Sequence, residues 1–247
     1  CNIALFSMDE NNPRIISHCK DGGYAAVFEN GYITIMKGTW KIRVIKVIDV
    51  PVTYGGKAVH NIMNCLPAVL STYFWRNIEI EDIRLALQTF IPSSTQTPGR
   101  LNLFQFKHFQ FLVDFAHNPA GLELLCDFVS KLDGEPKVGI ISGTGDRRDE
   151  DIKELGKISG RYFDEIIIRQ DKNLRGRTAE EIVNLLVAGI KETQPKEIPI
   201  EIIYNEKEAI MHAYNNVKPG SLITIMCDVV AEALDLIKGL KEKEDTE

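Results

Sequence analysis

The stretch that decides the fold is residues 97–119, TPGRLNLFQFKHFQFLVDFAHNP. It begins with a Gly-Arg turn, continues through a short β-type segment, and ends in a strand, Phe109–Asp114, that leads into Asn118-Pro119. Asn at a helix cap followed by Pro at the first helical position is a common helix start. That start leaves Asp114 and His117 unexplained, because both stand where a strand ends. Ligands of open α/β sheets bind at the carboxyl ends of the strands, so the stretch predicts a binding site there.

The second half of the chain alternates between apolar runs of strand length and amphipathic helical patterns. The runs are 109–114, 138–142, 165–169, 200–204 and 222–227, and the helical patterns lie near 119–132, 149–162, 178–193, 206–216 and 229–242. Thr178 with Glu181, and Asn205 with Glu208, have the spacing of a capping box at two of the helix starts. Continuous apolar strands between helices predict an α/β fold: a Rossmann-like, mostly parallel sheet with helices on both faces.

The first half of the chain is mixed. We expect a buried strand over 2–8, β-type runs over 24–29, 32–37 and 41–47, and a helical pair over 58–75 and 80–90. Asn30-Gly31 between two of the runs predicts a two-residue hairpin turn. Pro67 removes a backbone hydrogen bond inside the first helix, so we expect a kink there or a helix in two pieces. A polar segment near Thr95–Gly99 predicts the boundary between two domains, 1–98 and 99–247.

Composition and charge argue against several classes of partner. The formal net charge of −6 argues against nucleic acid and anionic membranes, because both favour a basic face. No apolar run approaches the roughly 20 residues of a membrane span, and we expect no signal peptide. The five cysteines (1, 19, 65, 126 and 227) are scattered and form no CxxC pair. We therefore expect buried, reduced thiols in a cytoplasmic protein, and no zinc site.

The Gly-Arg turn and the strand that ends in Asp-x-Ala-His-Asn-Pro resemble the junction between the central and C-terminal domains of Mur ligase-type enzymes, which are ATP-dependent amide-forming ligases. The sequence of residues 89–104, TFIPSSTQTPGRLNLF, is most similar to the branch of this family that makes cyanophycin. The chain starts without Met and contains no GxxxxGK(S/T) phosphate loop, which such a ligase needs to hold its triphosphate. We therefore expect a fragment: the trailing part of a Mur ligase central domain, followed by the C-terminal domain.

The resemblance implies an ATP site with six candidate residues: Asn61, Asn64, Arg100, Asp114, His117 and Asn118. It places Asp114 on the ribose, and it places His117, the implied catalytic residue, against the phosphates and the acyl-phosphate. It also brings Arg100 to the nucleotide and the two amides near residue 61, which share one helix face, to the adenine. Without the resemblance, Asn61 and Asn118 are ordinary helix caps and Arg100 is a solvated charge.

The resemblance also implies a site for the incoming amino acid in two loops that follow strands, GTGDRRD at 143–149 and DKNLRGR at 171–177. The candidate residues are Asp146, Arg147, Asp149, Asp171, Arg175 and Arg177. If that amino acid is arginine, the acids would pair with its guanidinium and Arg175 or Arg177 would hold its carboxylate. The plainer alternatives are a capped helix start for the first loop and a solvated basic loop for the second. The first loop lacks the third glycine of a dinucleotide fingerprint.

The implied function is one part of a ligase that joins arginine to aspartate side chains of a poly-aspartate backbone through an acyl-phosphate. The implied cofactors are ATP and Mg²⁺, with the metal ligands mostly upstream of this chain and none assigned within it. The implied partners are the amino acid and a peptide-like acceptor, and we expect an inactive isolated chain and a full-length homo-oligomer. Two alternatives stay open: another Mur-type ligase, of folylpolyglutamate or muramyl type, or a non-catalytic nucleotide-sensing or scaffold module, which the missing phosphate loop favours.

Overall fold

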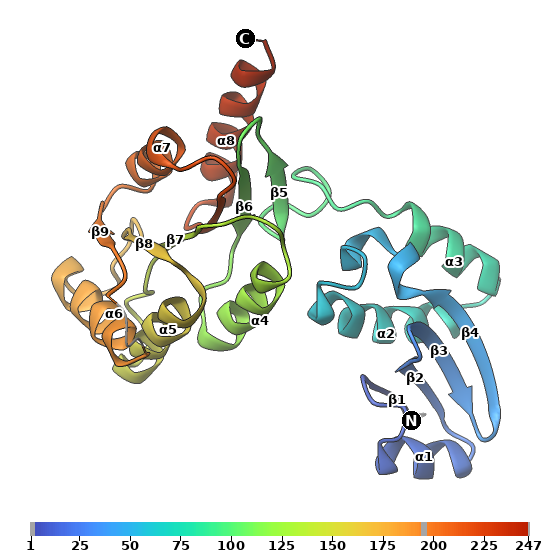
Figure 1. The fold of residues 1–247 in the computed structure, drawn as a ribbon. Helices are drawn as coiled ribbons and strands as arrows, with labels where there is room; N and C mark the ends of the chain where they lie inside the picture. The colour runs from blue at the N-terminus through green and yellow to red at the C-terminus, as the bar shows by residue number, and fades with distance from the viewer. Residues whose placement is uncertain (1–2, 194–196, 247) are drawn as a thin grey trace. The chain divides into compact units, whose positions relative to one another are not determined.

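The computed structural model describes residues 3–193 and 197–246 and divides the chain into two compact units (Figure 1). The N-terminal unit is Cys1–Pro92 and the C-terminal unit is Ser93–Glu247. Each unit has a hydrophobic core of its own.

The N-terminal unit is built on a four-stranded sheet. Its strands, in sheet order, are β1 (Ala4–Ser7), β2 (Tyr24–Glu29), β3 (Tyr32–Lys37) and β4 (Trp40–Lys46). β1 is parallel to β2, and the other neighbouring pairs are antiparallel. The helices are α1 (Pro13–Lys20), α2 (Val59–Tyr73) and α3 (Ile80–Thr89), and two short 3-10 helices, η1 (Val47–Asp49) and η2 (Pro51–Thr53), precede α2.

The hairpin predicted at Asn30-Gly31 is confirmed. Both turn residues are left-handed, with φ of 49° and 81°, as a two-residue turn between twisted strands requires. The strand predicted over residues 2–8 is present as β1, but it is not buried as predicted. β1 is the edge strand of its sheet, and its side chains alternate between exposed and half-buried. Asn2, the first residue of the predicted strand, lies outside the described residues.

Two helices of the N-terminal unit differ from the expectations. α1 was not predicted, but Asn12 Oδ1 accepts the N–H of Arg14 at 3.0 Å and caps a helix that begins at Pro13. α2 runs without interruption through Pro67, so a helix in two pieces is wrong. The burial of this helix in the core outweighs the hydrogen bond that proline removes; its buried side chains include Ile62, Leu66 and Val69.

The C-terminal unit is built on a six-stranded sheet in the order β5-β6-β10-β7-β8-β9. The strands are β5 (Asn102–Gln105), β6 (Gln110–Asp114), β7 (Lys137–Ile141), β8 (Glu165–Ile168), β9 (Ile200–Ile202) and β10 (Leu222–Met226). β5 is antiparallel to β6, and the other neighbouring pairs are parallel. The helices are α4 (Pro119–Ser130), α5 (Asp149–Tyr162), α6 (Ala179–Thr193), α7 (Glu206–Asn216) and α8 (Val230–Thr246).

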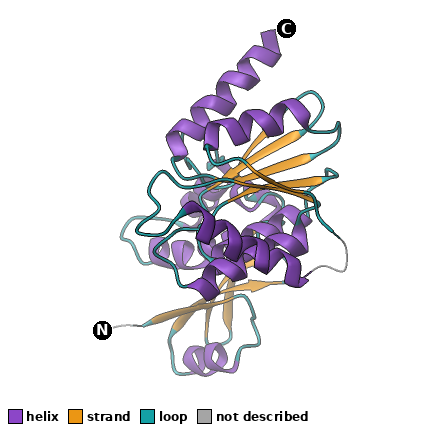
Figure 2. Ribbon diagram, turned by 90° about the vertical axis from the view of Figure 1, so that its left-hand side faces the viewer, coloured by secondary structure: helices purple, strands orange, loops and turns teal. Residues whose placement is uncertain are grey.

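Helices cover both faces of this sheet, as the alternating pattern predicted. α4, α5 and α6 pack side by side on one face, and α7 and α8 lie on the other (Figures 1 and 2). The five predicted strands and five predicted helices are confirmed, with differences of a few residues at their ends. The Thr178–Glu181 capping box is confirmed in both directions, and Asn205 caps α7 by accepting the N–H of Glu208.

β10 is the central strand, and its position brings several strand ends together. It pairs in parallel with β6 on one side and with β7 on the other, and each of its residues is buried. The chain moves outward through β7, β8 and β9, and then returns to insert β10 next to β6. Because parallel crossovers are right-handed, this reversal puts α7 on the face opposite to α4–α6. The loops after β6, β7, β8 and β10 thus meet at one carboxyl edge.

α5 and α6 pack closely because glycine on each helix faces the backbone of the other. A Cβ on Gly189 of α6 would lie 2.0 Å from the carbonyl oxygen of Lys153, and one on Gly156 of α5 would lie 2.2 Å from that of Leu186. Atoms in a close-packed interior do not approach so closely. The present spacing of the two helices therefore depends on glycine at these positions.

Gly189→Ala should lower the free energy of unfolding by about 2 kcal/mol, because the helix backbones must move apart to admit a methyl group. Gly239→Ala is the matched control, since Gly239 lies inside α8 with open space at its Cβ position. There the same change should be neutral or stabilise the chain by up to about 1 kcal/mol, the ordinary helix preference for Ala over Gly. Urea unfolding followed by circular dichroism measures both. Equal effects at the two positions would contradict the packing argument.

Candidate functional site

Asp114, the last residue of β6, joins two loops at the carboxyl edge. Its Oδ2 accepts the N–H of Leu101 at 2.9 Å, and its Oδ1 accepts the N–H of Ala116 at 2.8 Å. Burial raises the pKa of the Asp114 carboxyl above its ordinary value, although these N–H groups and Arg100 oppose the rise. A carboxylate has about four lone-pair directions, so Asp114 can still accept a hydrogen bond from a ligand hydroxyl.

The turn that precedes β5 is fixed to the body of the C-terminal unit. The Oδ1 of Asn102 accepts the N–H of Gly99 at 2.7 Å. Gly99 has a φ of +68°, and a Cβ there would lie 2.7 Å from the side chain of Val230, so the position requires glycine. The turn leaves Arg100 exposed, with its guanidinium carbon 5.6 Å from the centre of the Phe115 ring. Arg100 therefore lies next to the loop that follows β6.

His117 lies in the loop after β6, half-buried. Its Nδ1 is 2.9 Å from the carbonyl oxygen of Phe115, and the centres of the two rings are 4.8 Å apart. A ring nitrogen must carry a hydrogen to bond a carbonyl oxygen, so neutral His117 has its proton on Nδ1 and a lone pair on Nε2. Asn118 caps α4, as predicted, by accepting the N–H of Gly121 at 2.8 Å.

The two loops predicted to hold the amino acid contact each other at the ends of β7 and β8. Arg175 pairs with Asp146 at 2.5 Å, and Arg177 pairs with Asp149 at 2.6 Å. The guanidinium of Arg177 also donates to two backbone carbonyls of the first loop, each at 2.9 Å. Four of the six candidate residues are thus paired with one another across the two loops, and the Arg175–Asp146 pair is about half exposed.

Asp171, the fifth candidate, belongs to a network around a buried arginine that the sequence analysis missed. Arg169 directly follows β8 and is 1% exposed. Its Nη1 is 2.5 Å from Asp171, and its Nε is 3.1 Å from both Glu206 and the carbonyl oxygen of Met226, which also accepts from Nη2. One signal was available: a charged residue at the end of an Ile-Ile-Ile run is unusual in a buried strand.

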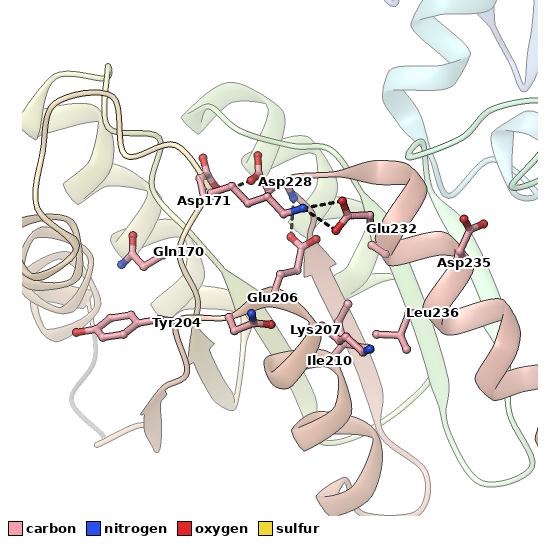
Figure 3. Close-up of a pocket in the computed structure, with 13 residues that line it drawn as sticks. Gln170, Asp171, Tyr204, Glu206, Lys207, Ile210, Asp228, Glu232, Asp235 and Leu236 are labelled. Atoms are coloured by element: carbon pink, nitrogen blue, oxygen red, sulfur yellow. Dashed lines mark hydrogen bonds and ion pairs between the residues drawn. The ribbon is translucent and has the colours of Figure 1, made fainter.

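A cavity of about 780 Å³ opens beside this network, at the ends of β8, β9 and β10. Its lining includes the carboxylates of Asp171, Glu206, Asp228, Glu232 and Asp235, the cations Lys172 and Lys207, and the apolar residues Ile210, Ala233 and Leu236. Figure 3 shows the first four carboxylates gathered at one side of the cavity, with Ile210 and Leu236 at the other. The volume falls in the range of small-molecule sites.

The N-terminal unit carries the two amides predicted beside the adenine. Asn61 lies in the first turn of α2, and its Nδ2 donates to the carbonyl of Val52 at 2.8 Å. The cap of α2 is Ala58, which makes no side-chain cap bond, so ordinary capping by Asn61 is wrong. Asn64 lies one turn further along the helix and is exposed.

Within residues 3–193 and 197–246, no group of three or more His, Cys, Asp or Glu side chains is arranged to hold a metal ion. In the same described part of the chain, no helix combines the length and apolar character that a membrane crossing needs. Cys19, Cys65, Cys126 and Cys227 are buried free thiols, as predicted, and Cys1 lies outside the described residues. Burial raises the pKa of the Cys65 thiol to about 11, which keeps it protonated near neutral pH.

Several known proteins are similar to this chain in sequence or in fold. Residues 99–228 match the family model described as Mur ligase, glutamate ligase domain. The cyanophycin synthetase of Crocosphaera subtropica is 43% identical over 95% of this chain, and the chain spans only 27% of that relative's length. A UDP-N-acetylmuramoyl-L-alanyl-D-glutamate--2,6-diaminopimelate ligase of Aquifex aeolicus is 27% identical over 65% of this chain and 31% of its own length. The structure of E. coli FolC in complex with DHPP and ADP shares the fold, with a TM-score of 0.63 at 15% identity over 96% of this chain and 53% of FolC.

Asp114→Ala should destabilise the C-terminal unit by about 3 kcal/mol, because it leaves two buried N–H groups without their charged acceptor. Asp114→Asn, which keeps one acceptor oxygen, should lose less. Asp127→Ala is the control: its carboxylate pairs with Lys131 on the exposed side of α4, so its loss should have little effect. Thermal and urea unfolding of the three variants would contradict this role if Asp114→Ala unfolded like the Asp127 control.

Proposed function

We propose that this chain, which belongs to the Mur ligase family by the match of residues 99–228, is part of an ATP-dependent ligase that joins a carboxylate to an incoming amino acid. The observation that carries this proposal is the arrangement of loops at one sheet edge. The loop with Asp114 and His117 follows β6, and the loops rich in Asp and Arg follow β7 and β8. A nucleotide site beside an amino-acid site is what amide formation through a phosphorylated intermediate requires.

We assign the nucleotide to residues at the carboxyl edge of the six-stranded sheet. Asp114 accepts the ribose hydroxyls with the lone pairs that Leu101 and Ala116 leave unused. Arg100, exposed on its fixed turn, contributes positive charge toward the phosphates. Asn118 closes the loop by capping α4. Asn61 and Asn64, in the N-terminal unit, remain the residues predicted to contact the adenine. The similarity to FolC, whose structure contains ADP, supports a nucleotide in this fold.

The proposed reaction has two displacement steps. A carboxylate oxygen of the acceptor attacks the γ-phosphorus of ATP and ADP leaves; the amine of the amino acid then attacks the acyl carbon and phosphate leaves. The amine reacts only after its ammonium form has lost a proton, and Nε2 of His117 can accept that proton because Nδ1 carries the other hydrogen. Mg²⁺ would neutralise the phosphates, and no ligand for it is assigned among the described residues.

The proposed amino acid is arginine, and the proposed acceptor is the aspartate side chains of a poly-aspartate backbone. The support is the relative order of similarity: 43% identity over nearly the whole chain to a cyanophycin synthetase, against 27% over 65% of the chain to a diaminopimelate ligase. The loop charges suit an amino acid with a guanidinium and a carboxylate. The residues assigned to it are Asp146, Arg147, Asp149, Asp171, Arg175 and Arg177.

The longer relatives suggest where the remaining parts of the site come from. The 247 residues contain no phosphate loop, and we assign that loop and the metal ligands to another part of a longer protein. We also place this protein in the cytoplasm, where its free thiols stay reduced, and expect it to be a homo-oligomer. Exposed apolar side chains of the N-terminal unit support a surface that is covered in the assembly; they include Ile3, Phe6, Phe74 and Trp75.

The isolated 247-residue chain should bind ATP only weakly, with a dissociation constant of about 1 mM, or roughly −4 kcal/mol, because it lacks a phosphate loop. It should release no phosphate with ATP, arginine and a poly-aspartate acceptor. Calorimetry and a phosphate-release assay test both statements, and the longer protein that carries this chain is the positive control. Micromolar ATP binding by the isolated chain would contradict the prediction, and a longer protein that binds ATP without turnover would favour the nucleotide-sensing module.

Asp146→Lys in the longer enzyme should raise the Michaelis constant for arginine about tenfold or more, because it replaces a carboxylate at the amino-acid site by a repelling charge. The Michaelis constant for ATP should stay within about a factor of two. Asp127→Lys, on the exposed side of α4, controls for the change in net charge. If Asp146→Lys and its control gave the same arginine dependence, Asp146 would not belong to the amino-acid site.

A further inference from the structure

Arg169 is a buried charge that the proposed function does not yet use. Its side chain is 1% exposed, and a guanidinium removed from water is costly unless its donors are fully paired. Replacing such a buried ion pair by apolar residues is often neutral or stabilising in proteins. Stability alone is therefore a weak reason for an arginine at this position, and its contacts suggest another one.

The guanidinium connects elements that are not neighbours in the sheet. The backbone N–H of Arg169 bonds to Ile141 on β7, whereas its side chain reaches past the end of β7 to the carbonyl of Met226 on β10. It also pairs with Glu206, the first residue of α7, at 3.1 Å. A single side chain thus sets the positions of the ends of β8 and β10 and the start of α7, which surround the cavity together with β9 and α8.

Both carboxylates held by Arg169 are part of the cavity wall. Asp171 Oδ1 accepts from Arg169 at 2.5 Å and from Ser142 Oγ at 3.0 Å, so its orientation is fixed from two sides. Glu206 Oε2 accepts the N–H of Asp228 at 2.6 Å, which ties it to the loop after β10. Burial raises the pKa of Glu206, and Arg169 opposes that rise and favours the carboxylate form.

The wall of the cavity keeps an excess of negative charge after this pairing. Its lining has five carboxylate residues against two lysines, and Arg169 behind the wall adds one more cation. The Lys172 ammonium is already paired with Glu232 at 2.6 Å. The remaining surface is apolar, from Ile210, Ala233 and Leu236. Such a site attracts a cation on an aliphatic stem and repels an amino acid with a second carboxylate.

We infer that Arg169 is a positioning residue of the amino-acid site: it fixes Asp171 and Glu206 in the cavity wall, where they receive the cationic side chain of the incoming amino acid. The inference rests on the proposed ligase function and adds two residues, Arg169 and Glu206, to it. It assigns the choice of a cationic amino acid to the cavity at β8, α7 and β10. Arg169 itself touches carboxylates, not the reacting atoms.

The test compares arginine with citrulline, its uncharged isostere, as substrates of the full-length enzyme that contains this chain. The variants are Arg169→Met, Arg169→Lys and Glu206→Gln. Arg161→Met is the control, because Arg161 lies away from the cavity, where it makes surface ion pairs with Glu123 and Glu154 and lies over the Tyr162 ring. The ratio of kcat/KM for arginine to that for citrulline should fall about tenfold or more in Arg169→Met and Glu206→Gln, the scale of a lost supporting contact. Arg169→Lys should restore part of it, and the control should leave it unchanged.

Each outcome of the comparison decides the inference. A parallel loss of kcat/KM for both substrates, or an unchanged ratio in Glu206→Gln, would overturn it, because a purely structural role weakens both reactions alike. If Arg169→Met does not fold by circular dichroism, Glu206→Gln decides alone, since glutamine keeps an acceptor for the N–H of Asp228. A wild-type enzyme that releases phosphate with a neutral or acidic amino acid but not with arginine would keep the proposed ligase and overturn this inference. A wild-type enzyme without amino-acid-dependent phosphate release would overturn both.

Discussion

The pairing of β10 with β6 on one side and β7 on the other is the constraint on which the C-terminal unit depends. It inserts the last strand of the chain between two earlier ones, and it buries that strand completely. The insertion sets Met226 and the loop after it next to Asp114, whose carbonyl accepts the N–H of Cys227 at 2.9 Å. It also gives Arg169 a carbonyl to bond on the far side of β7. Because of this strand order, the loop after β6, proposed to bind the nucleotide, shares one edge with the loops after β7 and β8, proposed to bind the amino acid.

Much of this architecture could be predicted from hydrophobic periodicity, and the exceptions have physical reasons. Fully buried parallel strands such as Leu222–Met226 are continuous apolar runs, so they and the helices between them stand out in the sequence. β1 is also an apolar run. Whether it is buried depends on which strand pairs with its outer edge, and the amino-acid sequence of the strand does not show this. α1 was missed because Asn12-Pro13 suits both a turn and a helix start. α2 continues through Pro67 because its side chains are buried in the core, and the sequence alone does not show this burial.

The position of the charged loops was predictable, but the contacts between them were not. Strand ends identified the loops that carry Asp114, Asp146 and Asp171, because parallel strands all end at one edge. Which charges pair depends on folding: Arg175 and Asp146 are 29 residues apart, and Arg169 bonds a carbonyl 57 residues away. A sequence gives no rule for such pairs. Glu206 was noticed only as part of a helix start, since its partner Arg169 stands in a different strand–helix unit.

The charged groups at this edge differ in how much a substitution at each would lower the free energy of unfolding. This difference divides the edge into a rigid part and an adaptable part. Asp114 and Arg169 are buried and bond the backbone of other loops, so a change at either leaves buried polar groups unpaired. The pair of Asp146 and Arg175 is about half exposed, and such pairs contribute at most about 1 kcal/mol to stability. The exposed loops can therefore change their charges while the buried groups keep the strand ends in place. A fold that holds one strand end through a buried carboxylate and joins the neighbouring loops through exposed ion pairs can vary the charge of those loops without losing its strand order.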